Sequence, residues 1–199
     1  MRIIAGAWRG RRLRAPAGAA TRPTAGRVRQ ALFDMLLHAP WGGRALVEGA
    51  AVLDAFAGTG GLGLEALSRG AATATFIERD RAALAALRAN IAACRAGDRA
   101  QVLAADATAP PPGRPCGLVF LDPPYGAALV ARAVPALAAA GWIAPGALIL
   151  AELGRDDPLP ALGAALAERA HGAARLVVWQ AEGGSTGAAP VLSAGRSPG

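Results

Sequence analysis

Short apolar runs alternate with amphipathic segments along most of this chain. Continuous apolar runs that end at a glycine or an acid are typical of strands buried on both faces of a parallel sheet. Apolar residues three and four positions apart between these runs predict helices. We expect strands at 51–56, 73–78, 101–104, 118–122, 147–152 and 175–180, and helices at 62–68, 80–94, 127–139 and 162–168. Strands that alternate with helices predict an α/β fold with a mostly parallel sheet and helices on both faces.

The first forty residues follow another pattern. Residues 1–15 alternate loosely, with glycines between short apolar pieces, and this favours a small β-hairpin. Thr24 is a suitable N-cap residue, and apolar residues recur at helical spacing from 28 to 36. We expect that face to pack on the sheet domain, with Arg27 and Arg29 pointing elsewhere. The chain thus divides into a hairpin and helix extension at 1–40, a sheet domain at 41–181 and a flexible Gly- and Ser-rich tail at 182–199.

Composition narrows the class of protein. A chain of 199 residues can bury one core. Residues 133–151 form an uncharged run of membrane-spanning length, but Pro135, Gly141 and Pro145 interrupt it, which favours a helix, a turn and a strand. Arginines interrupt any apolar signal segment near the start, and the two cysteines and two histidines lack metal-ligand spacing. We therefore expect a cytoplasmic monomer that holds no metal and does not enter a membrane.

Positive charge is concentrated at the start of the chain. All 21 basic residues are arginines, and residues 1–33 hold eight of them and no acid. The remaining chain carries 13 arginines against 14 acidic residues, so the net charge of +7 comes from the first sixth of the sequence. A concentrated basic segment is typical of a protein that binds a polyanion, most simply nucleic acid through its phosphates. A solvated tail is the alternative interpretation.

A glycine-rich turn follows the first predicted strand. Gly58, Gly60 and Gly63 match the G-x-G-x-x-G fingerprint, and Glu78 ends the next strand, where a ribose hydroxyl would bind. An NAD pyrophosphate would bind at the helix N-terminus, but Asp54 places a carboxylate beside the turn. That charge is unfavourable beside a pyrophosphate and favourable beside an ammonium group. We therefore expect a cofactor with a ribose, an adenine and an amino-acid tail, which is S-adenosylmethionine.

A second motif, Asp122-Pro123-Pro124-Tyr125, follows the fourth predicted strand. Two prolines in succession form a stiff, extended loop whose carbonyl groups can accept hydrogen bonds. Acceptors in one plane with an aromatic ring beside them suit a planar base that carries an exocyclic NH2 group. A surface turn with Tyr125 in ordinary packing is the alternative. Because the first and fourth strands are expected to be neighbours, the two motifs would form one cleft, which favours an amino-methyltransferase.

Five blocks of the sequence match a known family in order and spacing, at 1–10, 21–33, 54–63, 76–80 and 122–125. With them the chain resembles the RsmD-type 16S ribosomal RNA guanine-N2 methyltransferases, in the class I S-adenosylmethionine-dependent superfamily. The resemblance extends to about residue 181, and the Arg-Pro-Thr block at 22–24 is its most specific part. It implies a Rossmann-like sheet and methyl transfer to N2 of one guanine in 16S rRNA, within an assembling small ribosomal subunit.

We assign candidate residues to three roles. Asp106 ends the third predicted strand, and we expect it to accept a hydrogen bond from the adenine amine. The cofactor set is Asp54, Phe56, Gly58, Thr59, Gly60, Glu78, Arg79 and Asp106. The catalytic set is Asp122, Pro123 and Tyr125, and the RNA-binding set is Arg9, Arg11, Arg12, Arg22 and Arg27. Arg22 and Thr24 have an alternative role, which is to close over the methionine end of the cofactor.

Three other functions compete with this interpretation. The Asp-Pro-Pro-Tyr tetrapeptide also serves DNA adenine and cytosine amino-methyltransferases, but the chain has no room for a target-recognition domain between its motifs. A dehydrogenase-like NAD protein would leave that tetrapeptide and the basic segment unexplained. A non-catalytic RNA-binding assembly factor that retains an inherited pocket is the third.

Overall fold

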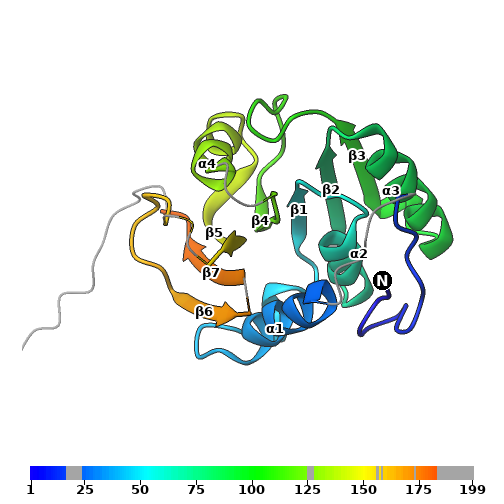
Figure 1. Cartoon of the computed structure of the whole chain (residues 1–199), viewed down its shortest axis with the longest axis horizontal. Helices are drawn as coiled ribbons and strands as arrows, with labels where there is room; N and C mark the ends of the chain where they lie inside the picture. The colour runs from blue at the N-terminus through cyan, green and yellow to red at the C-terminus, as the bar shows by residue number, and fades with distance from the viewer. Residues whose placement is uncertain (17–23, 125–127, 156, 158, 173, 183–199) are drawn as a thin grey trace, which may run out of the picture.

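The computed structural model describes residues 1–16, 24–124, 128–155, 157, 159–172 and 174–182. Within these residues, seven strands form one sheet in the order β3-β2-β1-β4-β5-β7-β6 (Figure 1). The strands are β1 (Ala51–Ala55), β2 (Thr73–Glu78), β3 (Ala100–Ala104), β4 (Cys116–Leu121), β5 (Ile143–Gly154), β6 (Ala167–His171) and β7 (Ala174–Gln180). The helices are α1 (Thr24–His38), α2 (Gly61–Ser68), α3 (Arg81–Cys94) and α4 (Leu129–Ala139), with 3₁₀ turns η1 (Arg44–Leu46) and η2 (Gly97–Arg99). Of the tail expected at 182–199, residues 183–199 lie outside the described residues.

The sheet is parallel from β3 to β5. Pairs β1–β2, β2–β3, β1–β4 and β4–β5 are parallel, whereas β7 pairs antiparallel with both β5 and β6. The prediction of a mostly parallel sheet is therefore confirmed. The chain builds β1 to β3 toward one edge and returns to place β4 on the other side of β1. Ligands of open α/β sheets bind at the carboxyl ends of the strands at such a reversal.

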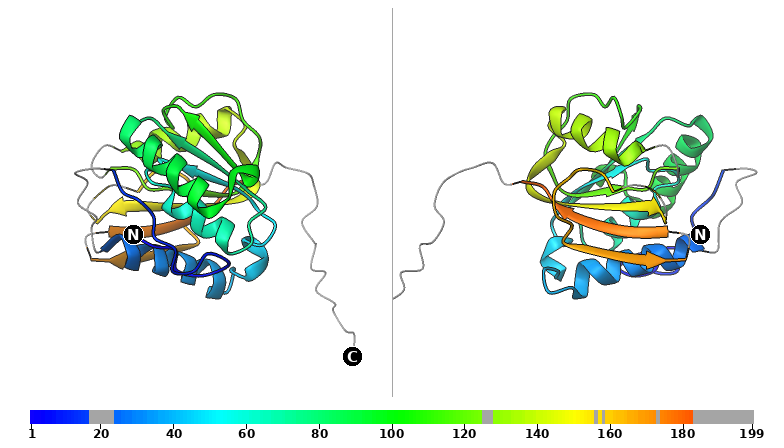
Figure 2. Two further views of the ribbon diagram at one scale, coloured as in Figure 1. Left: turned by 90° about the vertical axis from the view of Figure 1, so that its right-hand side faces the viewer. Right: turned by 60° about the vertical axis from the view of Figure 1, so that its left-hand side comes forward.

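Helices cover both faces of the sheet, as predicted (Figures 1 and 2). Side chains alternate between the faces along a strand, so Leu53 and Leu121 belong to the buried cluster that includes α4, and Phe120 belongs to the cluster that includes α1, α2 and α3. The rings of Phe120 and Phe33 of α1 lie 5.6 Å apart, centroid to centroid. Asp54 is the register partner of Phe120 and therefore lies on the α1 face of the sheet.

The predicted helix at 162–168 is wrong. The chain bends through 161–164 and then forms β6, which pairs with the outer edge of β7. Gly163 has a φ of +81°, which is incompatible with a helix interior. Alanine-rich sequence favours a helix locally, but the edge of β7 offers backbone hydrogen bonds that this segment can satisfy only as a strand. The other predicted elements are confirmed, and β5 is longer than expected.

The first residues form the expected hairpin. Arg2 and Arg12 make an antiparallel bridge, and the Ile3 N–H donates to the Arg11 carbonyl at 2.9 Å. Ile3 and Leu13 are only 1% and 5% exposed, so both sides of the hairpin contribute to the main core. The hairpin is therefore an integral part of the domain and packs into its core.

A buried glutamate fixes the hairpin and α1 to the domain. Glu65 in α2 accepts hydrogen bonds from the backbone N–H groups of Ile4 and Ala5 at 2.7 and 3.0 Å. It also pairs with Arg69 at 2.9 Å and with Arg29 at 3.8 Å. The prediction that Arg29 points away from the domain is wrong, because its side chain is 5% exposed. Burial lowers the pKa of Arg29, and the charge of Glu65 opposes that shift.

We expect Glu65→Ala to lower the free energy of unfolding by about 3–5 kcal/mol, because it leaves a buried guanidinium without its counter-charge. Urea denaturation followed by circular dichroism measures this loss. Glu48→Ala is the matched control, since Glu48 pairs with Arg44 at 3.3 Å on the surface and such pairs contribute about 0–1 kcal/mol. Equal losses in the two variants would contradict a structural role for the buried pair.

Candidate functional site

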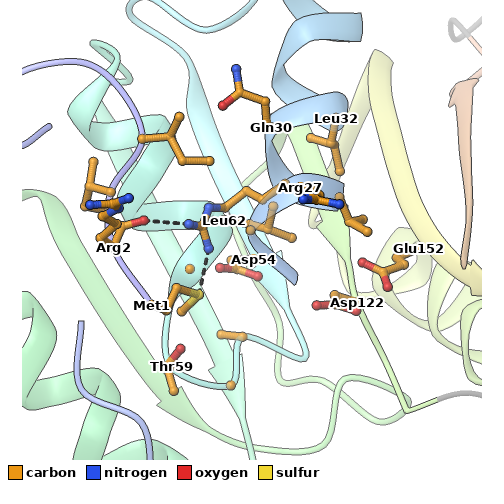
Figure 3. Close-up of a pocket in the computed structure, with 18 of the residues that line it drawn as sticks. Met1, Arg2, Arg27, Gln30, Leu32, Asp54, Thr59, Leu62, Asp122 and Glu152 are labelled. Atoms are coloured by element: carbon orange, nitrogen blue, oxygen red, sulfur yellow. Dashed lines mark hydrogen bonds between the residues drawn. The ribbon is translucent and has the colours of Figure 1, made fainter. Parts of the chain in front are cut away.

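Both sequence motifs open into one cavity of about 1270 Å³. Its wall includes the glycine turn between Phe56 and Leu62, Asp54 at the end of β1, and residues 122–124 after β4. Figure 3 shows Asp54, Thr59 and Asp122 around this space, with α1 on its far side. The predicted single cleft is therefore present, because β1 and β4 are paired neighbours that end at the same edge of the sheet.

The backbone of the glycine turn adopts positive φ angles, which glycine accommodates most easily. Phe56, Gly58 and Gly60 have φ angles of +64°, +53° and +82°, and Gly60 is the N-cap of α2. A Cβ atom on Gly60 would lie 2.5 Å from a methyl group of Leu87, so the turn approaches α3 too closely for any other residue. The Gly58 N–H donates to Glu78 Oε2 at 2.8 Å. These contacts hold the turn against β2 and α3, beside the cavity.

Asp54 contributes a buried carboxylate to the cavity wall. It is 1% exposed and accepts a hydrogen bond from the Gly63 N–H, in the first turn of α2, at 2.8 Å. Burial is the main cause that raises the pKa of Asp54 to about 8; the Gly63 hydrogen bond opposes the shift, and the charges of Asp122 and Glu78 add to it. A cation beside Asp54 would favour the ionised form. The site therefore suits an ammonium or sulfonium group, whose positive charge would stabilise the ionised form of Asp54.

Four residues of the predicted cofactor set are not among the residues that line the cavity: Gly60, Glu78, Arg79 and Asp106. Glu78 accepts hydrogen bonds from the N–H groups of Arg79 and Asp80 at 2.7 and 2.8 Å. Arg79 pairs with Asp106 at 2.7 Å, and Asp106 also accepts from the N–H and hydroxyl of Thr108. The Thr108 hydrogen bonds are the main cause that lowers the pKa of Asp106. Both carboxylates thus order their own loops, and their contacts with ribose and adenine stay predictions.

A third carboxylate lies beside Asp122, and the sequence reasoning missed it. The last register pair of β4 and β5 is Leu121 with Ala151, so Asp122 and Glu152 are the next residues on the two paired strands. Both line the cavity, and Figure 3 shows their carboxylates side by side. Glu152 was predicted only as the last residue of a strand. The signal available was its position, since Asp122 and Glu152 each stand at the end of a predicted strand.

Arginines of the hairpin and α1 form the opposite wall. Arg29 donates to Met1 Sδ and to the Arg2 carbonyl, both at 2.6 Å, which ties α1 to the hairpin (Figure 3). Arg9 and Arg27 of the predicted RNA-binding set are exposed and line the cavity. The remaining described members are Arg11, which donates to the Ala93 carbonyl, and Arg12 in the exposed hairpin bridge. The structure thus brings basic side chains to the mouth of the predicted site.

Asn90 links the hairpin to the glycine turn, and the sequence analysis did not identify it. Its amide donates to the Arg14 carbonyl and the Thr59 carbonyl, each at 3.0 Å. Its oxygen accepts from the Arg14 N–H at 2.7 Å. Asn90 is fully buried in α3. A lone asparagine in an apolar helix face gives no sequence signal of such a contact, because both partners are distant in the chain.

Tyr125 and Arg22 lie outside the described residues, as does the side chain of Thr24, so their roles stay predictions. In the part of the chain that the structure describes, no helix has the length and apolar character to cross a membrane. The same residues contain no group of three or more His, Cys, Asp or Glu side chains arranged to hold a metal ion. Cys94 and Cys116 are buried free thiols.

Comparison with known proteins gives consistent matches over most of the chain. The profile of the family described as Conserved hypothetical protein 95 matches residues 1–180. The ribosomal RNA small subunit methyltransferase D of Escherichia coli is 43% identical over 166 residues, which cover 82% of this chain and 80% of that protein. The corresponding protein of Haemophilus influenzae is 38% identical over 164 residues, with 80% and 81% covered.

A solved structure supports the same relationship. The structure of yhhF from Escherichia coli superposes with a TM-score of 0.78 at 40% identity, and covers 92% of this chain and 99% of that one. A more distant structure, the T. thermophilus 16S rRNA N2 methyltransferase with AdoMet and guanosine, has a TM-score of 0.63 at 20% identity over 83% of this chain and 45% of that one. The second likeness shows the fold alone, which is that of a class I methyltransferase.

We expect the Asp54 carboxyl group to make stability fall as pH rises from about 4 to about 8. Its pKa is raised in the folded protein, so over that window the folded state binds more protons at this group than the unfolded state does. The free energy of unfolding therefore falls by up to about 1.4 kcal/mol for each unit of pH. Urea denaturation at pH 5, 6.5 and 8 measures the slope. Asp54→Asn keeps the acceptor for Gly63 but does not titrate, so its profile should be flatter; parallel profiles would refute the raised pKa.

Proposed function

We propose that this chain, which belongs to the Conserved hypothetical protein 95 family together with the ribosomal RNA small subunit methyltransferase D proteins, methylates the exocyclic N2 of a guanine in 16S rRNA. Membership of the family makes the chain a methyltransferase. The observation that carries the finer assignment is the shared cavity: the glycine turn and the Asp122-Pro123-Pro124 loop line one space. A donor held at the first and an amine held at the second would be within reach of each other.

The cofactor that we propose is S-adenosylmethionine. When bound, it supplies a methyl group made electrophilic by its sulfonium sulfur. Asp54, Phe56, Gly58, Thr59 and Gly60 would hold it, because they form the end of β1 and the turn beside the cavity. The buried carboxylate of Asp54 would face its positive charge, which is the feature that argues against NAD. Glu78, Arg79 and Asp106, at the ends of β2 and β3, would contact its ribose and adenine.

The Asp122 loop would activate the acceptor. The lone pair of a guanine N2 is conjugated with the ring, so the amine is a poor nucleophile. Hydrogen bonds from its two N–H groups to the Asp122 carboxylate and the Pro123 carbonyl would bend the nitrogen toward a tetrahedral geometry and expose the lone pair. Catalysis is then mainly a matter of positioning, and the methylated amine loses its extra proton to Asp122 or to water. Tyr125 would stack on a base turned out of the RNA.

The basic hairpin and α1 would hold the RNA backbone. Arg9, Arg11 and Arg12 lie in the hairpin, Arg27 in α1, and Arg22 in the segment between them. Arg9 and Arg27 also line the cavity, so phosphates bound there would flank the target base. The excess of arginine in this part of the chain supports a polyanionic substrate.

Methyl incorporation is the direct test of the proposal. Radiolabelled S-adenosylmethionine is offered with undermethylated small ribosomal subunits, free 16S rRNA or DNA, and the methylated nucleoside is identified by mass spectrometry. We expect N2-methylguanosine in rRNA, with assembling subunits as the better substrate. Methylated adenine or cytosine in DNA would replace the proposal with a DNA methyltransferase, and no incorporation would favour a non-catalytic assembly factor.

We expect Asp122→Ala to lower kcat/KM for methyl transfer by at least about 100-fold, because the acceptor amine loses the charged group that positions it. The dissociation constant for S-adenosylmethionine, measured by calorimetry, should change little, since Asp122 belongs to the acceptor side. Asp98→Ala is the control, because it removes an exposed carboxylate in η2, away from the cavity. Full activity in Asp122→Ala would refute the assigned role.

We expect Arg9→Ala and Arg27→Ala each to weaken rRNA binding and to lower the slope of log affinity against log salt by about 1. Filter binding at salt concentrations from about 50 to about 200 mM measures the affinity for rRNA and gives this slope. Arg132→Ala removes the same charge from an exposed position on α4, across the sheet, and should leave the slope unchanged. Point variants are required, because a deletion of the segment would also remove the buried residues Ile3 and Leu13.

A further inference from the structure

Glu152 is fixed beside Asp122 by sheet register. Phe120 pairs with Leu150 and Leu121 with Ala151 in the parallel pair β4–β5. Asp122 is the first residue after β4 and Glu152 follows Ala151 within β5, so the register brings the two residues next to each other. Side chains alternate along a strand, which puts Glu152 and Asp122 on the α1 face with Phe120. Both residues line the cavity, and their carboxylates lie next to each other in Figure 3.

Two neighbouring carboxylates are hydrogen-bond acceptors that complement the donors on the Watson–Crick edge of guanine. Guanine presents two adjacent groups of donors on its Watson–Crick edge, the N1–H and the N2 amine. Adenine and cytosine each present a bare ring nitrogen, an acceptor, beside their amine. A base whose amine is held at Asp122 would therefore turn its ring N1 position toward the neighbouring strand, where Glu152 lies. A carboxylate at that point accepts from guanine and repels the lone pair of the other two bases.

We propose that Glu152 selects guanine by accepting a hydrogen bond from its N1–H while Asp122 and Pro123 hold the N2 amine. This inference rests on the proposed function, and it assigns base selection to a residue separate from the group that positions the reacting nitrogen. Glu152 is half-buried, so solvent screens its charge less than that of a surface group. It is longer than Asp122 by one methylene, which lets it reach past the amine to the ring.

The contributions of the exocyclic amine and of the ring N1–H to recognition can be tested separately with 2-aminopurine. This base keeps the exocyclic amine of guanine at the same ring position, but its N1 carries no hydrogen. Small subunits are reconstituted with 16S rRNA that carries either guanine or 2-aminopurine at the position that the native protein methylates. We expect the wild-type protein to prefer guanine by at least about 100-fold in kcat/KM, because a site built around a donor rejects an analogue that lacks it.

The variant Glu152→Gln tests the residue itself. A glutamine can turn its amide NH2 toward an acceptor, so we expect the preference for guanine to fall to within about 10-fold, mostly through a lower kcat/KM for guanine. Asp34→Asn is the matched control, because Asp34 lines the same cavity from α1 and its substitution removes the same charge. The control should retain the full preference for guanine.

The possible results distinguish base selection from a role in cofactor binding or in folding. Equal use of guanine and 2-aminopurine by the wild-type protein would overturn the inference, whatever the variants do. A Glu152→Gln protein that loses activity on both substrates by the same factor would also overturn it, since the residue would then serve the cofactor or the fold. Failure of the wild-type protein to methylate guanine at all would instead overturn the proposed function, and the inference with it.

Discussion

Parallel pairing between β1 and β4 is the constraint on which the site depends. The two strands are hydrogen-bonded along their length and end at the same edge of the sheet, so the loops that follow them open into one cavity. Each loop is stiff for its own reason, since positive φ angles and close packing hold the glycine turn while successive prolines hold the other. Chemistry between two bound molecules requires this rigidity, because reactivity falls steeply when reacting atoms are misplaced.

Buried polar contacts join the hairpin and α1 to the same domain. Glu65 binds the backbone of the hairpin and the guanidinium of Arg29, and Asn90 joins the hairpin to the carbonyl of Thr59. A surface that would hold RNA phosphates is thereby connected to the turn that would hold the cofactor. Such polar groups are costly to bury unless every partner is present, so they specify one position of the hairpin on the domain.

Local patterns predicted most elements and failed where contact with another element decided the structure. The segment 162–168 has helical composition, yet it becomes β6 because the edge of β7 lies beside it. Arg29 has the charge of a surface residue, yet it is buried because Glu65 lies on the facing helix. Asn90 carries no local signal of its contacts, and the position of Glu152 at a predicted strand end becomes informative only when the neighbouring strand is known. Strand β7 follows β6 directly, but the partners of Arg29, Asn90 and Glu152 are far away in sequence, where periodicity and turn chemistry give no information.

The sequence by itself determined the α/β class and the order of strands and helices around the glycine turn, and it predicted the type of chemistry at the two motifs. These properties follow from side-chain period, from the conformations of glycine and proline, and from the charge of nearby residues, all of which act over a few positions. Only the tertiary structure decided that Asp54 is buried with a raised pKa, that the hairpin is anchored by Glu65, and that Glu152 faces the cavity beside Asp122. Burial and register depend on which elements pack together, and that choice is made by the whole chain.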